Sequence, residues 1–597
     1  MYKQRIAALD RTIHAPRNHP QQQQQQAGHG PVEYRKLLQR FRQFLAEEDK
    51  FWALLVVRFR RAFALAEAQP ALTALGILPA THEGLNDNTD VTEAAHNNSR
   101  GHFLFPSEDT TACLTPQTPA QREGRLAILS KALVCLGDIA RYRELYNESG
   151  GRPKAGHEES VPLRKVVRGR RGGAAGQVHE VLGRARNYDK AQLCYEQARL
   201  LVPSEGNSSH QLAILASYKK DAFGSLVHYY RALCVRQPYD TASENLGTVL
   251  SKALEQWRVR ARKEKGASKD AEKGGSVPLV PRLRVEVFKE KVVVLHALWR
   301  LGVEKYVLFS LKPSTSSPSD RMDAISPKHA QDAREDFFAL VSERCLPPDM
   351  ISKSVILSQG ALWKHRMIRE PATTEPPKDG DDSLPSATSA EAIEARMLAH
   401  VLTIHETLLQ IGVVELAEAP PEDAAENDLA QRITAPFRRT LPALRIASKW
   451  LRANFGYVIQ SQELEKPLSG SSTHNGKEHR AGELATCISQ FWTTYTQFST
   501  SLWRTFPRER LPVLTAPLEE DVDMRGFLPL RQMMGDLKDA GYQKEVLCDV
   551  PSKISSVEGL VHPNEEQLMR ITDLLDDAKT LVTMEASSLL IARILIH

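Results

Sequence analysis

The sequence has few cysteines, and none of them has the spacing of a metal site. Seven cysteines are spread over 597 residues without a CxxC pair or a Cys/His pair at ligand spacing. This argues against a zinc site and fits a reducing compartment. The longest apolar runs, such as VVVL at 292–295, are too short to span a membrane, and the N-terminus lacks a signal-peptide core. We expect a cytoplasmic protein, with shuttling to the nucleus open as an alternative, and no membrane contact, metal or cofactor.

Motifs of catalytic chemistry are missing as well. The sequence contains no GxSxG, no Walker loop, no HExxH and no paired Cys/His nucleophile. These absences argue against the common hydrolase, nucleotidase and metalloprotease classes. We therefore expect no enzyme and no catalytic residues.

A strong excess of charge of one sign is also absent. The formal net charge of +5 is too small for this length to indicate nucleic-acid binding by itself. Two basic runs, RKVVRGRRGG and RVRARKEKG, lack the interleaved aromatics on which bases stack, so solvated loops are the favoured interpretation. A weak contact with nucleic-acid phosphates stays open as an alternative.

Helical periodicity is what the sequence does have. Apolar residues recur at helical spacing from Val32 onward, and alternating strand patterns are almost absent, which predicts an all-α fold. The stretch through QQQQQQAGHG is of low complexity and predicts a disordered Gln-rich leader over 1–31. Segments rich in Pro, Gly, Ser or acid predict loops at about 83–122 and 147–186 and linkers at about 312–328 and 370–392.

The middle of the chain contains an internal repeat. Ala191, Tyr195 and Ala198 are followed 34 residues later by a matching set, Ser225, Tyr229 and Ala232. This is the tetratricopeptide period. Small residues in LG at 136–137 and LA at 212–213 occupy the place where a partner helix approaches closely. We therefore predict two helix pairs.

Several motifs carry a resemblance to a known family. LGDIARYR, NYDKAQLCYEQARLLVPSEGNSSHQLAILASYKKD and HYYRALCVRQPYDTASENL resemble the tetratricopeptide core of the ever-shorter-telomeres and SMG proteins. WLRANFGYVIQSQE, FWTTYTQFSTSLW and DVDMRGFLPLR are similar to the helical-hairpin region of that family, especially of its seventh SMG member. The resemblance implies a 14-3-3-like tetratricopeptide domain over about 32–265 and an α-helical hairpin domain over about 280–597.

The resemblance also implies a function. The family's surveillance branch consists of adaptors of nonsense-mediated mRNA decay, which read phosphoserine on the up-frameshift RNA helicase and recruit decay or dephosphorylation factors. A heterodimer with a second family member is a further implied partner. The alternative is the telomeric branch, a telomerase-associated subunit that binds telomerase RNA or single-stranded telomeric DNA. The acids Glu519, Glu520, Asp521 and Asp523 invite a metal-nuclease interpretation, but they precede a non-catalytic helical motif, so we favour a solvated loop.

Mapped onto this sequence, the resemblance implies a phosphate-binding pair at Arg141 and Tyr142. A guanidinium offers forked donors to a phosphate dianion and a tyrosine adds a hydroxyl, which makes strong charge-assisted hydrogen bonds. Asp138 lies one turn before Arg141 and is placed to hold it. The alternatives are an exposed Asp138–Arg141 pair and a packed aromatic at Tyr142.

Further residues of the implied groove are less well matched. Asn245 corresponds to the asparagine that holds the peptide backbone. An early basic residue is expected soon after Trp52, and we favour Arg58 over Arg60 and Arg61. His210 stands where the family often has asparagine, and a structural role for it is the alternative.

Overall fold

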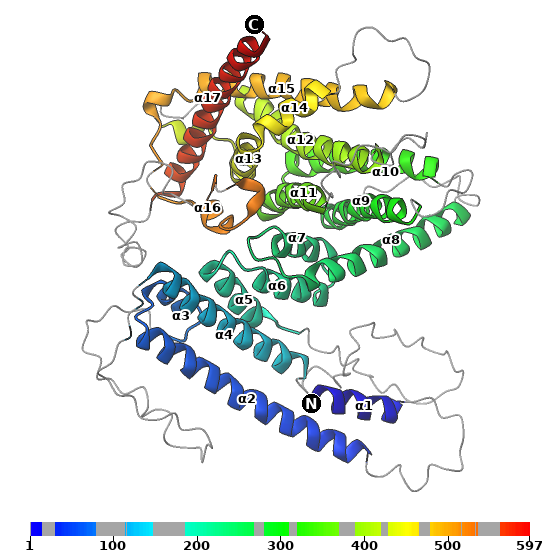
Figure 1. The fold of residues 1–597 in the computed structure, drawn as a ribbon, viewed down its shortest axis with the longest axis vertical. Coiled ribbons are helices and arrows are strands. Elements are labelled where there is room, and N and C mark those ends of the chain that lie inside the picture. Colours follow the sequence, from blue (N-terminus) through cyan, green and yellow to red (C-terminus); the bar gives the residue numbers. More distant parts are fainter. Residues whose placement is uncertain are drawn as a thin grey trace, which may run out of the picture. The chain divides into compact units, whose positions relative to one another are not determined.

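The structure is a computed structural model that describes residues 2–14, 30–78, 114, 116, 118–146, 186–267, 280–309, 319–368, 388–418, 428–464, 478–514, 516–531, 533–534 and 561–596. The chain divides into two compact units, Met1–Val202 and Pro203–His597. Throughout the described ranges the regular elements are helices (Figure 1), and the β-pairing found there is an isolated bridge between Glu205 and Gln237. The predicted all-α class is confirmed.

The first unit is built on two long antiparallel helices. Its elements are α1 (Tyr2–His14), α2 (Gly30–Ala62), η1 (Ala66–Ala68), α3 (Gln69–Ala74), α4 (Pro119–Leu145) and α5 (Asp189–Leu201). Asp49 of α2 pairs with Arg143 near the end of α4 at 2.7 Å, while the Arg125 guanidinium near the start of α4 lies 4.2 Å from the ring centroid of Phe63. These contacts fix the opposite directions of α2 and α4, which run side by side in Figure 1.

The predicted disordered leader is wrong for its first part. Residues 2–14 form α1, and the side chain of Ile6 is fully buried against α2 in a cluster with Leu38 and Phe41. The physical reason is that one apolar stripe on a short helix suffices for docking, although composition over the whole segment is polar. Residues 15–29 of the predicted leader lie outside the described residues, as do the predicted insertion at 147–185 and most of the loop before α4.

The second unit is a larger helical array around one continuous core. Its helices are α6 (Asn207–Tyr218), α7 (Ala222–Leu233), α8 (Thr241–Ala267), α9 (Pro281–Phe309), α10 (Ser319–Ser342), α11 (Pro348–Ile368), α12 (Thr388–Ala417), α13 (Ala435–Ala453), α14 (Phe455–Leu464), α15 (Glu478–Thr505), α16 (Glu519–Asp523) and α17 (Pro563–Ile596), with 3-10 turns η3 (Leu429–Arg432), η4 (Arg508–Arg510) and η5 (Leu528–Leu530). Buried apolar residues from Ala213 to Leu581 form one cluster.

The two predicted helix pairs are present as α4 with α5 and α6 with α7. Small residues mark the close approaches. Ser130 Oγ of α4 donates to the Ala198 carbonyl of α5 at 3.1 Å, and Ser225 Oγ of α7 donates to the Ala213 carbonyl of α6 at 3.0 Å. Both contacts need a hydroxyl small enough to sit between helix backbones.

Two boundaries differ from the predictions. The compact units divide after Val202, not between 265 and 280, because α6, α7 and α8 contribute to the core that reaches Leu581. The predicted linker at 312–328 is wrong from Ser319 onward, where α10 begins and continues through Pro327. A proline removes one helical hydrogen bond, and buried downstream residues such as Phe337 offset that cost.

Helix α12 has an apolar stretch, Glu391–Ala417, that is long enough to cross a membrane. Most of its 18-residue window, 72%, is nevertheless buried inside the fold. Leu402 and Leu408 on this stretch are fully buried among other helices. This is the pattern of a core helix.

Two of the acids of α16 are buried, so the prediction of a solvated loop there is wrong for Glu520 and Asp521. Arg445 of α13 donates to Glu520 and Asp521 at 2.8 Å each, and to Asp573 of α17 at 2.5 Å. Burial opposes ionisation of Glu520, but Arg570 and Arg445 outweigh it and lower the pKa of that carboxyl. The prediction failed because Arg445 and Arg570, which pair with these acids, lie far from α16 in the sequence.

Three buried histidines line the interior of the second unit. Burial lowers the pKa of His296 to about 3, that of His400 to about 4 and that of His405 to about 3. A neutral imidazole is therefore required in the folded state, because a charged one would lose its hydration there.

We predict a loss of stability below pH 6.5. The folded pKa values lie below the unfolded value of about 6.5, so only the unfolded chain takes up protons between them, and stability falls as the pH falls. From pH 7.5 to 5.5 each histidine contributes a loss of about 1.4 kcal/mol. His405→Leu should reduce the accompanying drop in unfolding temperature, whereas His562→Ala, which changes an exposed histidine, should not. Equal drops in the wild type and His405→Leu would contradict this prediction.

Candidate functional site

The predicted phosphate-binding arginine lies near the end of α4. The helix begins at Pro119, where Thr118 caps it by accepting from the Gln121 N–H at 3.2 Å. Arg141 is only 5% exposed, although its neighbour Arg143 is exposed. Its Nη2 donates to Asp138 Oδ1 at 2.7 Å, so the predicted contact between the two residues is present. The pair is buried on the arginine side, unlike the exposed pair considered as the alternative.

Asp138 is shared between two helices. Its Oδ1 also accepts a hydrogen bond from Tyr195 Oη of α5 at 2.7 Å. Burial raises the pKa of Tyr195 strongly, and the hydrogen bond to Asp138 adds to this, so the phenol remains a donor at neutral pH. The carboxylate thus fixes the orientation of the guanidinium before any ligand binds.

Gly137 allows this arrangement because it has no side chain. A Cβ at this position would lie 2.4 Å from Cε1 of Tyr195. No real Cβ makes a contact that short, so Tyr195 would have to move away from α4. The small residue noted in the repeat therefore positions the tyrosine that holds Asp138.

Tyr142 is half-buried and faces two cations. Arg141 Nη2 lies 3.4 Å from Tyr142 Oη, and Lys3 of α1 donates to the same oxygen. The Lys3 Nζ lies 3.7 Å from the ring centroid and Arg141 Cζ lies 4.9 Å from it. Both cations benefit from the negative face of the ring. Sequence reasoning missed Lys3, and its only signal was a lysine on the apolar-striped helix that begins at Tyr2.

Asp49 of α2 forms a second charged contact nearby. It accepts from Arg143 at 2.7 Å and from Lys190 of α5 at 3.2 Å. These pairs are largely exposed on the cation side, so each contributes little stability. They link α2, α4 and α5 beside Arg141.

Arg58 lies further along α2 than Asp49, the residue that contacts the end of α4. Asp49 is beside Arg143, and Arg58 is nine residues further along the helix, which is about 13 Å at the rise of an α-helix. Arg60 and Arg61 lie further still, toward Phe63 and the start of α4. The role of Arg58 stays a prediction, and the contacts of Tyr142 point instead to Lys3.

The remaining two predicted residues belong to the second compact unit. Asn245 Nδ2 lies 2.9 Å from His210 Nε2. His210 is 4% exposed and its ring centroid lies 4.6 Å from that of Tyr239 in a tilted arrangement, which favours a structural role for it. The carboxamide of Asn245 has two N–H donors and a carbonyl, so this contact leaves groups for a ligand. Their part in binding stays a prediction.

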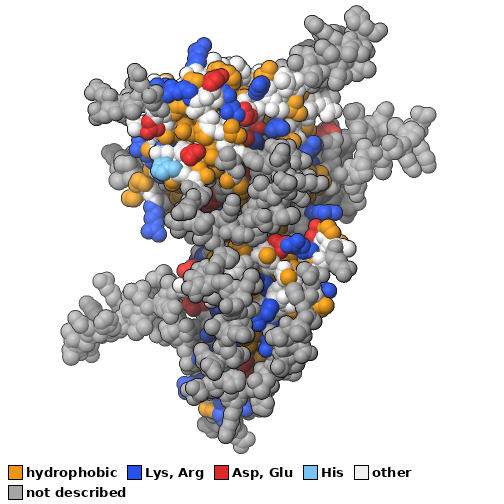
Figure 2. Space-filling model, turned by 90° about the vertical axis from the view of Figure 1, so that its left-hand side faces the viewer, with side chains coloured by type: hydrophobic (Ala, Val, Ile, Leu, Met, Phe, Trp, Pro, Cys, Tyr) orange, Lys and Arg blue, Asp and Glu red, His pale blue; other side chains and the backbone are white. Residues whose placement is uncertain are grey.

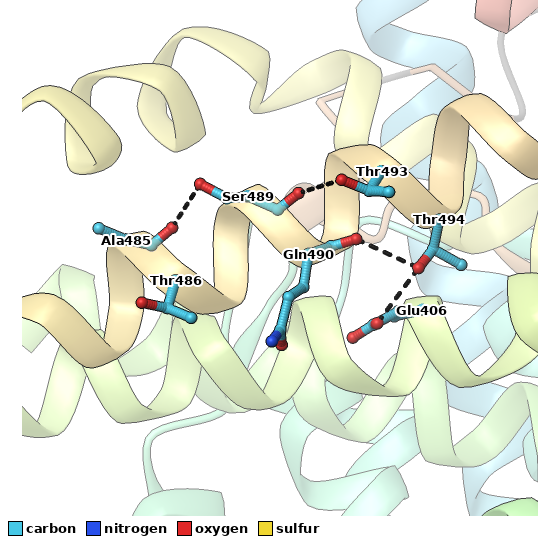
Figure 3. A pocket seen from close by; sticks show the side chains of 7 residues that line it. All are labelled: Glu406, Ala485, Thr486, Ser489, Gln490, Thr493 and Thr494. Carbon is cyan, nitrogen blue, oxygen red and sulfur yellow. Dashed lines mark hydrogen bonds between the residues drawn. The ribbon is translucent and has the colours of Figure 1, made fainter.

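A hollow beside α15 is an alternative to this site, and Figure 3 shows the side chains that line it. Its volume is about 530 Å³. Three of its hydroxyls have partners. Ser489 donates to the Ala485 carbonyl at 2.9 Å and Thr493 to the Ser489 carbonyl at 3.0 Å, while Thr494 donates to Glu406 of α12 at 3.3 Å. Across the described ranges, no group of three His, Cys, Asp or Glu side chains is placed to hold a metal. The hollow lacks a convergent reactive group.

The described side chains in the upper part of Figure 2 form no continuous basic stripe. There, Lys and Arg side chains alternate with acidic and apolar ones. Mixed charges of this kind give a weaker field than a continuous basic groove.

Two family models match the chain. One, described as "Est1 DNA/RNA binding domain", matches residues 191–341 and 374–533, which together are more than half of the chain. The other, described as "Telomerase activating protein Est1", matches residues 1–147. The second match includes Lys3, Asp138, Arg141 and Tyr142.

Known proteins show similarity over shorter stretches. The nonsense-mediated mRNA decay factor SMG7 of Arabidopsis thaliana is 32% identical over 127 residues, covering 21% of this chain and 9% of that protein. The telomerase-binding protein EST1A of Danio rerio is 27% identical over 154 residues, covering 25% of this chain and 8% of that protein. The matches thus span less than a tenth of these relatives.

A solved structure shares the fold over nearly the whole chain. It is titled "Crystal structure of Est1 and Cdc13" and aligns with a TM-score of 0.57 at 13% identity. The alignment covers 97% of this chain and 84% of that one. At this identity the likeness concerns the fold.

We predict that Gly137→Ala loosens the site while Gly124→Ala does not. Both glycines lie on α4, but a Cβ at Gly124 meets nothing within 4 Å. Gly137→Ala should cost about 1–3 kcal/mol because Tyr195 must shift, whereas Gly124→Ala should gain up to about 1 kcal/mol from helix propensity. Thermal unfolding of both variants checks the ranking. Equal unfolding temperatures would show that Tyr195 adapts without strain.

Proposed function

We propose a function on one premise: the chain belongs to the Est1 family. On that premise it is a phosphoserine-binding adaptor of nonsense-mediated mRNA decay. It docks on the phosphorylated up-frameshift RNA helicase and recruits decay or dephosphorylation factors, alone or with a second family member. We place this role in the cytoplasm, with shuttling to the nucleus. The similarity to SMG7 supports the proposal.

The observation that carries the proposal is the held guanidinium of Arg141. Asp138 and Tyr195 fix its position, and Tyr142 places a hydroxyl beside it. A phosphate dianion needs forked N–H donors and hydroxyl donors already in place, because ordering them on binding would reduce the affinity. These donors in the first unit support the proposal of a phosphate site.

Within the first unit, Arg141 and Tyr142 would hold the phosphate. For the second unit we keep a separate prediction, that Asn245 binds a peptide backbone through the carboxamide groups that its contact with His210 leaves. Family adaptors of this kind need no catalytic group.

We predict that Arg141→Gln abolishes phosphate dependence and that Arg143→Gln does not. Both changes remove one positive charge from the same turn of α4, but only Arg141 is held beside Tyr142. Affinity for a phosphoserine peptide from the helicase tail should fall at least about tenfold, or about 1.4 kcal/mol, in Arg141→Gln. Calorimetric titration with phosphorylated and unphosphorylated peptide checks this.

The neutral Gln variant is preferred to Arg141→Glu. Because Arg141 is buried against Asp138, a glutamate there would place two carboxylates together and destabilise the fold. The unfolding temperature of both variants should be measured alongside binding. Wild-type protein that binds both peptides equally would end the proposed function.

A telomerase-associated role is the second candidate, favoured by the matched DNA/RNA binding domain and the similarity to EST1A. In this role dispersed basic side chains bind telomerase RNA or single-stranded telomeric DNA through phosphates. We predict for it a fall in affinity of about tenfold or more between about 50 and about 200 mM salt. Fluorescence anisotropy with labelled single strands measures the slope. No binding at the lower salt concentration would eliminate this candidate.

A further inference from the structure

We propose that Lys3 of α1 is a phosphate-binding residue, acting with Arg141 and Tyr142. The inference rests on the proposed function and deepens it, because it assigns the second cation of the site. The resemblance places that cation on α2, at Arg58. The structure assigns it to the N-terminal helix instead.

Two cations converge on one hydroxyl. Lys3 donates to Tyr142 Oη, and Arg141 Nη2 lies 3.4 Å from the same atom. Their ring distances, 3.7 Å for Lys3 Nζ and 4.9 Å for Arg141 Cζ, confirm that both face Tyr142. Like charges this close repel each other, and an anion bound between them would turn that repulsion into attraction to a common partner.

The carboxylates of the described residues do not balance both cations around Tyr142. Asp138 pairs with Arg141, whereas Lys3 has no carboxylate partner among the described residues. An ammonium whose neighbours are a phenol and a guanidinium can form a charge-assisted hydrogen bond with an anionic ligand. A phosphoserine at neutral pH carries close to two negative charges, which matches this excess.

Helix α1 is held firmly enough to position Lys3. Ile6 is fully buried, and the ring of Tyr2 packs 5.4 Å from Phe41 and 5.6 Å from Phe44 of α2. These apolar contacts flank Lys3 on both sides in the sequence. The lysine is exposed, so its Nζ is accessible to a ligand.

A competing role for Lys3 is to cover the site. The ammonium would then occupy the place of an incoming partner at Tyr142, and its removal would strengthen binding. The two roles predict changes of affinity in opposite directions, so one measurement separates them.

The test compares Lys3→Ala with Arg5→Ala. Arg5 is an exposed cation on the same helix, two residues further on, and makes no ion pair within the described part of the chain. Affinity for a phosphoserine peptide of the helicase tail should fall about tenfold in Lys3→Ala and by less than about twofold in Arg5→Ala. Lys3→Arg should retain most of the affinity. Binding of the unphosphorylated peptide should be the same in all variants.

The outcomes separate this inference from the function on which it rests. Wild-type protein that ignores phosphorylation removes the proposed function. Wild-type protein that distinguishes the peptides while Lys3→Ala binds equally well, or more tightly, overturns the role of Lys3 alone. Equal losses in Lys3→Ala and Arg5→Ala also overturn it, because they indicate diffuse attraction. An unchanged unfolding temperature in Lys3→Ala shows that a loss of affinity comes from the site.

Discussion

A single carboxylate oxygen, Oδ1 of Asp138, organises the first unit. It accepts from Arg141 within α4 and from Tyr195 on α5, so it joins the two helices and orients the guanidinium at the same time. A buried guanidinium stays charged, so leaving it without a carboxylate partner would destabilise the fold. The electrostatics of the site, its rigidity and the packing of the first helix pair therefore depend on the same atom.

The two compact units use charge in opposite ways. In the second unit, Arg445 and Lys449 are enclosed by carboxylates of α16 and α17, and buried cations and acids are matched within the protein. In the first unit, Lys3 meets only the ring and hydroxyl of Tyr142 among the described residues. Matched charges hold helices together, whereas an unmatched cation on an accessible aromatic is available to a ligand.

The sequence predicted those features of the structure that depend on residues close together in the chain. The helix class, the two repeat pairs and the Asp138–Arg141 contact all follow from spacings of a few residues. Lys3 could not be found in this way, because its partner Tyr142 lies 139 residues further along the chain. The same holds for Glu520, whose buried state depends on Arg445, 75 residues away. From sequence alone, a run of charged residues is therefore predicted to be exposed to solvent, even where distant residues bury and neutralise it.

Arg231 of α7 pairs with an acid that is synthesised much later in the chain. It is 7% exposed, and its guanidinium donates to both carboxylate oxygens of Asp523, which lies 292 residues later in the chain. During synthesis α7 therefore emerges long before the acid that neutralises its arginine. Long-range closures of this kind are slow and expose apolar surface in the meantime. A nascent chain that ends before α16 lacks Asp523, so the contact of Arg231 with this acid can form only after most of the chain has been synthesised.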